Sequence, residues 1–380
     1  MNRLFHISLV AGARPNFMKV APVYHALAAG KEAARAAGID LRISIVHTGQ
    51  HYDENMSDVF FRDLGIHAPD RHLEVGSGSH AEQTAKIMIA FEKVVMEERP
   101  GFVVVVGDVN STIACALTAK KLGVRVAHVE AGLRSFDMGM AEEINRKLTD
   151  AISDLLFVTE ESGVRNLLAE GVAKEKIFLV GNVMIDTLLG NLKRIESGEF
   201  VPTGTVRDFC AGAGRYAVLT LHRPSNVDSV ESLAPLWGAI REIAGRIPVL
   251  FPAHPRTRRK IAEFGLGDGG VTMVDPVGYL DMLYAVRGAS MVVTDSGGLQ
   301  EETTALGVPC VTIRENTERP VTVEIGTNYL AGTKREGILS VAREILSGNA
   351  KKGSVPPLWD GIAAERIADI LFQNFFSVYE

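Results

Sequence analysis

Short runs of β-branched and other apolar residues alternate with longer stretches of helical periodicity along the chain. In the first half these strand-like runs occupy residues 4–10, 41–47, 102–106, 124–129, 155–159 and 176–180. Helical stretches such as 80–98 and 110–123 separate them. This alternation predicts a parallel sheet with helices on both of its faces.

The second half of the chain restarts the same rhythm after a loose region at 191–215. Its strand-like runs occupy residues 216–221, 247–252, 271–274, 290–294 and 309–313. A length of 380 residues suits two α/β domains better than one. We therefore predict an α/β fold of two Rossmann-like domains that face each other across a cleft. The expected bounds are 1–190, 191–360 and a C-terminal helix at 361–380 that could pack back on the first domain.

Charge and cysteine usage exclude several classes of protein. The formal net charge is -6 and no block of like charges interrupts the chain, which argues against a nucleic-acid binder. The three cysteines are far apart and none belongs to a CxxC or Cys/His cluster, so we expect neither a disulfide framework nor a metal site.

The N-terminal apolar run is too short for a signal sequence, and no run approaches the ~20 residues that span a bilayer. We expect a cytoplasmic protein that is not bound to a membrane.

The loops that follow the strands are the places to look for function, because parallel sheets bind ligands beyond the carboxyl ends of their strands. After the first strand comes AGARPNFMK, with Arg14 and Lys19 at the start of a predicted helix. Helix N-termini favour anions, so this pair is a candidate clamp for a phosphate or diphosphate. A solvated basic pair is the structural alternative.

Two carboxylates follow two consecutive predicted strands. Asp108 lies in GDVNST after the strand at 102–106, and Glu130 lies in HVEAGLRS at the end of the next one. A carboxylate so close to a buried strand needs a partner or a task. The structural alternatives are a helix N-cap for Asp108 and an ion pair with Arg134 for Glu130.

A third carboxylate, Glu142, begins the predicted helix at 141–157. The apolar stripe of this helix comprises Ile144, Leu148, Ile152 and Leu155. The opposite side carries Glu142, Asn145, Arg146 and Thr149, and it faces either solvent or a cleft. A surface pair between Glu142 and Arg146 is the structural alternative here. Three carboxylates at successive strand ends nevertheless favour acid–base chemistry.

Histidine and arginine follow the first two strands of the second domain. LTLHRPSNVD places His222 and Arg223 at a strand end, and His is the side chain best suited to proton transfer or phosphate contact near neutral pH. PAHPRTRR follows the next strand and carries His254 in a basic rim with two arginines. A lone His is more often structural.

The strongest local signal is VVTDSGGLQEETTALGVP, at 292–309. A strand leads into a tight turn at Ser296, Gly297 and Gly298, and a helix begins there. The glycines allow a phosphate to approach the backbone, and the helix N-terminus supplies N–H donors. Glu301 and Glu302 follow, placed to hold ribose hydroxyls. The sequence therefore favours nucleotide binding over a mere tight connection.

Taken in order, these motifs resemble one known family. They are GARPNFMKVAPV, TGQHYD, GDVNST, HVEAGLRSFD, AEEINR, VGNVMIDTL, LHRPSNVD, TDSGGLQEE and ENTERPVT. Their order, from about residue 7 to about residue 332, is similar to that of the non-hydrolysing UDP-N-acetylglucosamine 2-epimerases. The resemblance implies a GT-B type fold with the nucleotide held mainly by the second domain. It also implies interconversion of UDP-GlcNAc and UDP-ManNAc without a cofactor, for cell-surface polysaccharide precursors, and a homodimer.

The resemblance also implies roles for individual residues. The family's catalytic residues fall on Asp108, Glu130, Glu142 and His222. Its phosphate and nucleotide contacts fall on Arg14, Lys19, Ser296, Gly298, Glu302 and Arg319. A second, activating site known in some bacterial relatives would use Gln50, Arg223 and His254. This chain departs from the family at Ala141, where Pro is usual, and at Glu82, where the activated relatives have Arg.

The expected chemistry needs carboxylates and a diphosphate clamp together. If the C1–O bond to UDP stretches first, the C2 proton becomes acidic and a carboxylate can remove it, which leaves 2-acetamidoglucal and UDP. Addition of UDP back after reprotonation on the other face completes the epimerisation. The sequence does not say which carboxylate is the base and which the acid. The alternatives are a hydrolysing epimerase that releases ManNAc, an epimerase of a modified UDP-GlcNAc, a GT-B glycosyltransferase and a nucleotide-sugar sensor.

Overall fold

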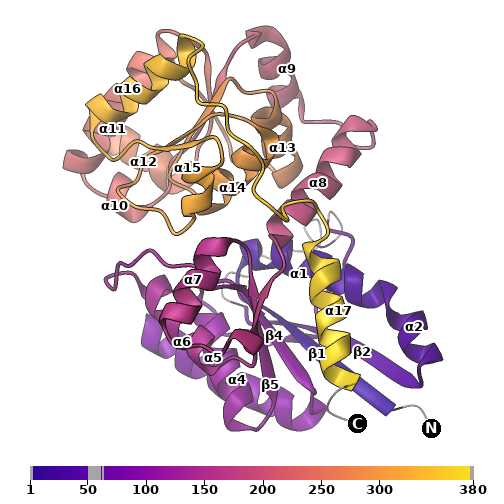
Figure 1. The fold of residues 1–380 in the computed structure, drawn as a ribbon. Coiled ribbons are helices and arrows are strands. Elements are labelled where there is room, and N and C mark those ends of the chain that lie inside the picture. Colours follow the sequence, from indigo (N-terminus) through magenta and orange to yellow (C-terminus); the bar gives the residue numbers. More distant parts are fainter. Residues whose placement is uncertain (1–2, 50–60, 62–63, 377–380) are drawn as a thin grey trace. The chain divides into compact units, whose positions relative to one another are not determined.

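The computed structural model describes residues 3–49, 61 and 64–376, without the side chains of Arg14, Phe375 and Phe376 (Figure 1). Two compact units make up the chain. Unit 1 comprises Met1–Thr187 and Pro357–Glu380, and unit 2 comprises Leu188–Pro356. The chain therefore leaves unit 1 once and returns to it for its last segment.

Unit 1 contains a seven-stranded sheet in its described part, with all neighbouring strands parallel. The strand order is β3-β2-β1-β4-β5-β6-β7. The strands are β1 (Arg3–Ala11), β2 (Ile39–His47), β3 (Arg71–His72), β4 (Phe102–Val106), β5 (Arg125–Ala131), β6 (Leu155–Val158) and β7 (Ile177–Leu179). The order reverses direction at β1 and β4, which is where ligands bind in sheets of this kind.

The helices of unit 1 cover both faces of this sheet. They are α1 (Arg14–Ala29), α2 (Lys31–Ala36), α4 (His80–Glu98), α5 (Asn110–Lys121), α6 (Ala141–Ile152), α7 (Glu161–Ala169), the 3-10 turn η1 (Lys174–Lys176) and α17 (Ala363–Phe376). The helix α8 (Val183–Glu196) begins in unit 1 and continues into unit 2. One apolar core joins α4 and α5 to the central strands, with Phe91 and Ile87 fully buried against Val103 and Val105. Central strands that are apolar on both faces explain why the sequence shows continuous runs instead of alternation.

The C-terminal helix α17 belongs to unit 1, although more than half of the chain separates it from its partners. It packs against α1, and Ile367 and Leu371 are fully buried. Its N-terminus is held by the Asp186 carboxylate of α8, which accepts backbone hydrogen bonds from Ala363 (3.2 Å) and Ala364 (2.7 Å). The sequence leaves open which domain this helix packs on, and in the structure it packs on unit 1.

Unit 2 contains a six-stranded parallel sheet in the order β10-β9-β8-β11-β12-β13. Its strands are β8 (Ala217–Thr220), β9 (Val249–Pro252), β10 (Thr272–Val274), β11 (Met291–Thr294), β12 (Cys310–Thr312) and β13 (Asn328–Leu330). Its helices are α9 (Gly204–Ala213), α10 (Pro224–Val227), α11 (Val230–Ala244), α12 (Pro255–Glu263), α13 (Tyr279–Arg287), α14 (Gly297–Leu306), α15 (Pro320–Glu324) and α16 (Arg335–Leu346). Trp237 and Phe251 centre the larger core. The predicted α/β fold with two parallel sheets is confirmed.

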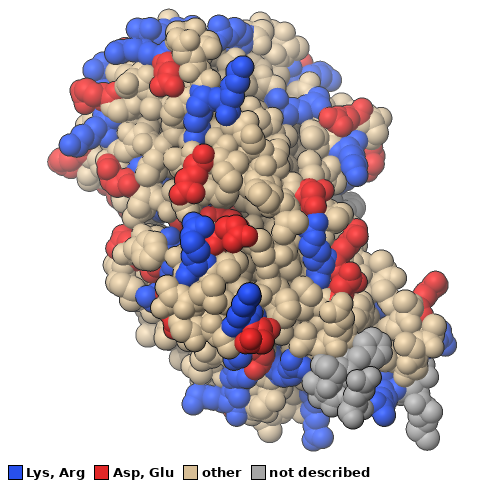
Figure 2. Space-filling model, viewed as in Figure 1, with Lys and Arg blue, Asp and Glu red and all other residues tan. Residues whose placement is uncertain are grey.

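Each strand-like run of the sequence corresponds to a strand, with ends that differ by one or two residues. The two strands that the sequence analysis missed, β3 and β13, are two and three residues long and lie at sheet edges. The sequences of these two strands, RH and NYL, contain no run of apolar residues of the kind that marks the other strands. None of the helices in the described ranges is long and apolar enough to cross a membrane. On the face shown in Figure 2, basic and acidic side chains are interspersed.

Candidate active site

Asp108 and Glu130 lie at the carboxyl edge of the unit 1 sheet, where Asp108 follows β4 and Glu130 is the last residue but one of the adjacent strand β5. Glu130 has a left-handed backbone conformation, with a φ of 74°, which is rare for a residue with a side chain. The register of β5 against β6 shifts between Val129 and Ala131 at this point. A bulge of this kind re-aims one side chain at the end of a strand, and strained backbone concentrates at functional sites.

Lys19 of α1 is the ion-pair partner of Glu130. Both side chains are buried, so the pair is shielded from solvent. Gly107, with a φ of 67°, makes room for them, because a Cβ there would lie 3.1 Å from the Lys19 Nζ atom and 3.3 Å from the Asn16 Nδ2 atom. The expected alternative partner of Glu130, Arg134, instead pairs with Asp150 (2.7 Å) and Glu170 (2.6 Å).

A buried network beneath this edge fixes the loop that carries Asp108. The His128 ring lies between the Asp150 carboxylate, at 2.7 Å from Nδ1, and the Gly107 carbonyl, at 2.8 Å from Nε2. Burial alone would raise the pKa of Asp150, but the contacts with His128 and Arg134 hold that pKa below its ordinary value. A satisfied buried network of this kind makes its surroundings rigid.

Arg146 of α6 holds the Asp108 carboxylate. Its Nε and Nη2 atoms donate to the Oδ2 atom of Asp108 at 3.0 and 2.7 Å, and its Nη1 atom pairs with Glu143 at 2.6 Å. The N-cap of α5 is Val109, and no side chain caps this helix. The structural alternative for Asp108, a helix N-cap, is therefore wrong. Asp108 is about a quarter exposed, so its carboxylate remains accessible to a ligand.

The orientation of α6 differs from the one that its periodicity predicts. Its polar residues Asn145, Arg146 and Thr149 are buried, whereas Ile144 and Leu148 of the predicted apolar stripe are exposed. The inward side is polar because Arg146 and its neighbours bind the loop after β4. Glu142 is exposed in the first turn of the helix, which begins at Ala141 even though the usual Pro is absent.

The His222 ring contacts the Asp295 carboxylate at the carboxyl edge of the unit 2 sheet. They follow the adjacent strands β8 and β11, and the His222 Nδ1 atom lies 2.9 Å from the Asp295 Oδ1 atom. Asp295 is fully buried and also accepts hydrogen bonds from the backbone amides of His222 and Arg223. Burial would raise the pKa of Asp295, but these contacts hold it below its ordinary value. Half of the His222 side chain is exposed, so the ring is both oriented and accessible.

The turn at Ser296, Gly297 and Gly298 leads directly into α14. Ser296 is the N-cap but its side chain makes no capping hydrogen bond, which leaves the helix N-terminus to other acceptors. A Cβ on Gly298 would meet nothing within 4 Å, so the space beside this residue is open. A Cβ on Gly297 would lie 2.8 Å from the Nη1 atom of Arg319, so that arginine borders the turn.

The two glutamates of α14 have different environments. Glu301 pairs with the Nε atom of Arg319 at 2.8 Å, and Arg319 also contacts Glu318 at 2.5 Å. Glu302 is buried beside Tyr279. Burial, together with the charge of Glu301, raises the pKa of Glu302 to about 8. Glu302 is therefore largely protonated at neutral pH.

Other predicted site residues have less distinctive surroundings. Arg14 occupies the first position of α1. Gln50 lies outside the described residues. His254 is the exposed N-cap of α12, and its Nδ1 atom accepts from the Arg256 amide at 3.2 Å. The Nε atom of Arg223 donates to the Asp295 carbonyl oxygen at 3.0 Å. Within the described ranges no group of three His, Cys, Asp or Glu side chains could hold a metal ion.

The sequence analysis missed the residues that position the others. Asp295 lies within the motif at 292–309 but is not among the predicted site residues, and neither are Glu143 and Asn16. Asp295 could have been found from its place directly after a buried strand, as Asp108 was. Glu143 binds Arg146 and the backbone amides of Ser135 and Phe136, contacts that only the folded loop creates.

Comparison with known proteins decides the family. The model of the family "UDP-N-acetylglucosamine 2-epimerase" matches residues 32–372, which is most of the chain. The chain belongs to the UDP-N-acetylglucosamine 2-epimerase family. The resemblance read from the motifs is thereby confirmed, as is the assignment to the isomerases.

Close relatives of this family member cover nearly its whole length. A UDP-N-acetylglucosamine 2-epimerase of Methanocaldococcus jannaschii is 44% identical over 375 residues, 96% of this chain and 98% of the relative. A crystal structure of the M. jannaschii enzyme in complex with UDP-GlcNAc and UDP has a TM-score of 0.86 and 43% identity, and the match covers 97% of this chain and 100% of that one. A UDP-2,3-diacetamido-2,3-dideoxy-D-glucuronate 2-epimerase of Pseudomonas aeruginosa is 41% identical over 368 residues, 96% of this chain and 99% of the relative.

Proposed function

We propose that the protein interconverts UDP-GlcNAc and UDP-ManNAc by inverting the configuration at C2 of the sugar. The observation that carries this proposal is a pair of carboxylates, Asp108 and Glu130, at the ends of two adjacent strands. Each is held by its own cation, Arg146 and Lys19 respectively. Membership of the epimerase family supplies the reaction to which such a pair of carboxylates is suited.

The reaction proceeds by elimination and addition of UDP. As the C1–O bond to UDP breaks, its electron pair leaves with the diphosphate. A carboxylate takes the C2 proton, and the C2–H electron pair forms the C1=C2 double bond of 2-acetamidoglucal. A second side chain, acting as the acid, then protonates C2 from the opposite face while the diphosphate oxygen attacks C1. Asp108, Glu130 and Glu142 are the candidates for these two proton transfers.

Nucleotide binding is the task that we propose for unit 2. The uncapped N-terminus of α14 presents backbone N–H groups, and the open space beside Gly298 lets a diphosphate reach them. His222, oriented by Asp295, would stabilise the negative charge that develops on the departing diphosphate. Arg14 and Lys19 of unit 1 remain proposed phosphate contacts. Glu302 and Arg319 are the proposed contacts of the nucleoside.

A second candidate substrate comes from the relatives. The P. aeruginosa relative is named for a 2,3-diacetamido uronic acid and is 41% identical, close to the 44% of the M. jannaschii relative. Identity therefore does not separate the two substrates. Both carry the same UDP group and the same reacting C2 centre, so the proposed chemistry serves either one.

Three further features are part of the proposal. We propose that the enzyme works as a homodimer, that it acts in the cytoplasm, and that its product is a precursor of cell-surface polysaccharide. The match to a structure with UDP-GlcNAc and UDP supports a UDP-sugar as its small-molecule partner. Gln50, Arg223 and His254 stay a prediction for a second, activating site.

Substrate and product can be tested in one experiment. The enzyme is incubated separately with UDP-GlcNAc and with UDP-2,3-diacetamido-2,3-dideoxy-D-glucuronate, and the products are separated by chromatography. We expect UDP-ManNAc from the first substrate at the higher kcat/KM. Free ManNAc would indicate a hydrolysing epimerase, and turnover of the uronate alone would replace the proposed substrate.

A further inference from the structure

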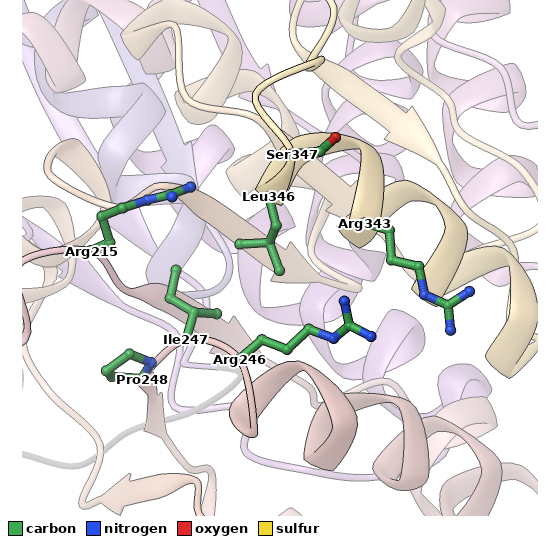
Figure 3. A pocket seen from close by; sticks show the side chains of 7 residues that line it. All are labelled: Arg215, Arg246, Ile247, Pro248, Arg343, Leu346 and Ser347. Atoms are coloured by element: carbon green, nitrogen blue, oxygen red, sulfur yellow. The ribbon is translucent and has the colours of Figure 1, made fainter.

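A cavity of about 590 Å³ opens in unit 2 at the edge of the sheet opposite to the candidate nucleotide site (Figure 3). Arg215 precedes β8, and Arg246, Ile247 and Pro248 precede β9, so the cavity lies at the amino ends of these strands. The Ser296–Gly298 turn, by contrast, follows the carboxyl end of β11. The two places are therefore separated by the length of the parallel sheet.

Three arginines and no carboxylate are among the residues that line this cavity. They are Arg215, Arg246 and Arg343, and the other lining residues are Ile247, Pro248, Leu346 and Ser347. In Figure 3, Arg246 and Arg343 approach each other on one side of Ile247 and Leu346, whereas Arg215 lies on the other side. The cavity thus has an apolar floor with guanidinium groups at two ends.

Glu242 of α11 holds two of these arginines in place. Its carboxylate lies 3.0 Å from Arg343 and 3.7 Å from Arg246, and it also binds Arg335 at 2.7 Å. Hydrogen bonding to Arg343 and the charges of Arg335 and Arg246 hold the pKa of Glu242 below its ordinary value. One carboxylate shared among three arginines leaves the group with a positive charge.

Two of the three arginines lie at the C-terminal ends of helices, and the third does not. Arg246 follows the C-terminus of α11 and Arg343 lies in the last turn of α16, where the helix dipole favours cations. Arg215 lies on the loop between α9 and β8, is exposed, and forms no ion pair with any residue in the described part of the chain. Its charge therefore remains available to a ligand.

We propose that this cavity binds a small phosphate-bearing molecule, with its phosphate groups on the arginines and its apolar or planar part on Ile247, Pro248 and Leu346. Guanidinium groups bind phosphate oxygens in a bidentate manner and stay charged throughout the accessible pH range. The cavity volume lies in the range of small-molecule sites, about 300–1,000 Å³. The site is distinct from the proposed catalytic and nucleotide residues.

Calorimetric titration of inorganic pyrophosphate into the full-length protein tests this site. The titration is done at about 0.15 M salt, where exposed charges are largely screened, and in the Gly298→Val background, in which the added side chain is expected to block the proposed nucleotide site without placing a nucleotide in the cavity. We expect saturable binding that weakens about tenfold in Arg215→Gln, because one charge-assisted contact is lost. ADP is expected to bind more tightly than pyrophosphate, since its nucleoside can cover the apolar floor.

Arg207→Gln is the matched control, because Arg207 is an exposed arginine on α9 and the substitution removes the same charge. We expect it to leave pyrophosphate binding unchanged. Equal weakening by the two variants would show general attraction to a basic surface and would overturn the site. Absence of saturable pyrophosphate binding in the Gly298→Val background alone would overturn it as well, and neither result depends on whether the enzyme epimerises UDP-GlcNAc.

Discussion

Individual carboxylates in this protein differ mainly in the cation that accompanies them. Asp108 is held by an arginine, which does not give up its proton in proteins, and Glu130 by a lysine, which can. Glu142 is exposed in the first turn of α6. The sequence predicted these three carboxylates from their places after strands. It could not predict their partners, because Lys19 lies far from Glu130 in the chain and only the parallel pairing of strands brings them together.

Substitution of each carboxylate by its uncharged amide distinguishes a catalytic role of that residue from a structural one. We expect Asp108→Asn and Glu130→Gln each to lower kcat by about 10²–10⁴-fold, the usual size of a general acid–base contribution. UDP affinity should change little, since the proposed nucleotide contacts of unit 2 are untouched. Steady-state kinetics and UDP titration measure both effects, with Glu97→Gln as an exposed control. If Glu142→Gln keeps nearly full activity, Glu142 is a surface residue and not a catalytic one.

The buried acid Glu302 makes stability depend on pH. Its pKa is about 8 in the folded chain and near 4.5 when exposed, so the folded state holds a proton that the unfolded state releases between these values. Stability from this group is complete below the lower value and is lost as pH rises through about 8. We expect Glu302→Gln, which mimics the neutral acid, to be more stable than the wild type by about 5 kcal/mol at about pH 9, and to be within about 1 kcal/mol of it at about pH 5.

Urea unfolding at the two pH values, followed by the fluorescence of Trp237 of unit 2 in a Trp359→Phe background, measures this difference. Glu263→Gln is the control, because Glu263 is an exposed glutamate of the same unit. The same pH dependence in the wild type and in Glu302→Gln would contradict a raised pKa for Glu302.

At the scale of elements, the sequence predicted the strands better than the faces of the helices. Apolar runs such as 102–106 identified the buried strands because both faces of a central parallel strand are covered. The predicted buried face of α6 is wrong, because the side that is buried carries Arg146 and Asn145. The partners of these two side chains lie on the loop after β4. Periodicity assumes that the buried side is apolar, and a functional site is where this assumption fails.

Two adjacent glycines at the start of α14 give a matched pair of substitutions. A side chain on Gly298 would enter open space, so Gly298→Val should leave stability unchanged but block a diphosphate from the helix N-terminus. We expect UDP affinity to fall at least about tenfold. Gly297→Val should instead destabilise unit 2, because its Cβ would lie 2.8 Å from Arg319. Calorimetry with UDP and thermal unfolding measure the two effects. Wild-type UDP affinity in Gly298→Val would remove this turn from the site.

At the scale of the whole molecule, the chain returns to unit 1 after completing unit 2. Helical periodicity predicted the last helix, but no local pattern shows which unit a helix at 363–376 will join. That choice depends on contacts such as those of α17 with α1 and of Asp186 with the start of α17. Contacts between residues so far apart in the chain cannot be predicted from a short segment of sequence.

Truncation of a buried side chain on α17 should therefore destabilise unit 1 and not unit 2. Leu371 is fully buried, so Leu371→Ala is expected to cost about 2–5 kcal/mol. The two tryptophans report the units separately, because Trp359 lies in unit 1 and Trp237 in unit 2. Urea unfolding in Trp237→Phe and Trp359→Phe backgrounds measures each unit, with Leu168→Ala as a half-exposed control. Equal destabilisation of both units would contradict the assignment of α17 to unit 1.

The central claim is that the protein exchanges the proton at C2 while it inverts that centre. Incubation with UDP-GlcNAc in deuterated water, without NAD or added metal, tests this claim by NMR of the sugar protons. The account predicts UDP-ManNAc with deuterium at C2, and gradual deuteration of the remaining UDP-GlcNAc through the reverse reaction. Glu130→Gln should slow both exchanges together. UDP-ManNAc that keeps the original hydrogen at C2, or no UDP-ManNAc at all, would contradict the account.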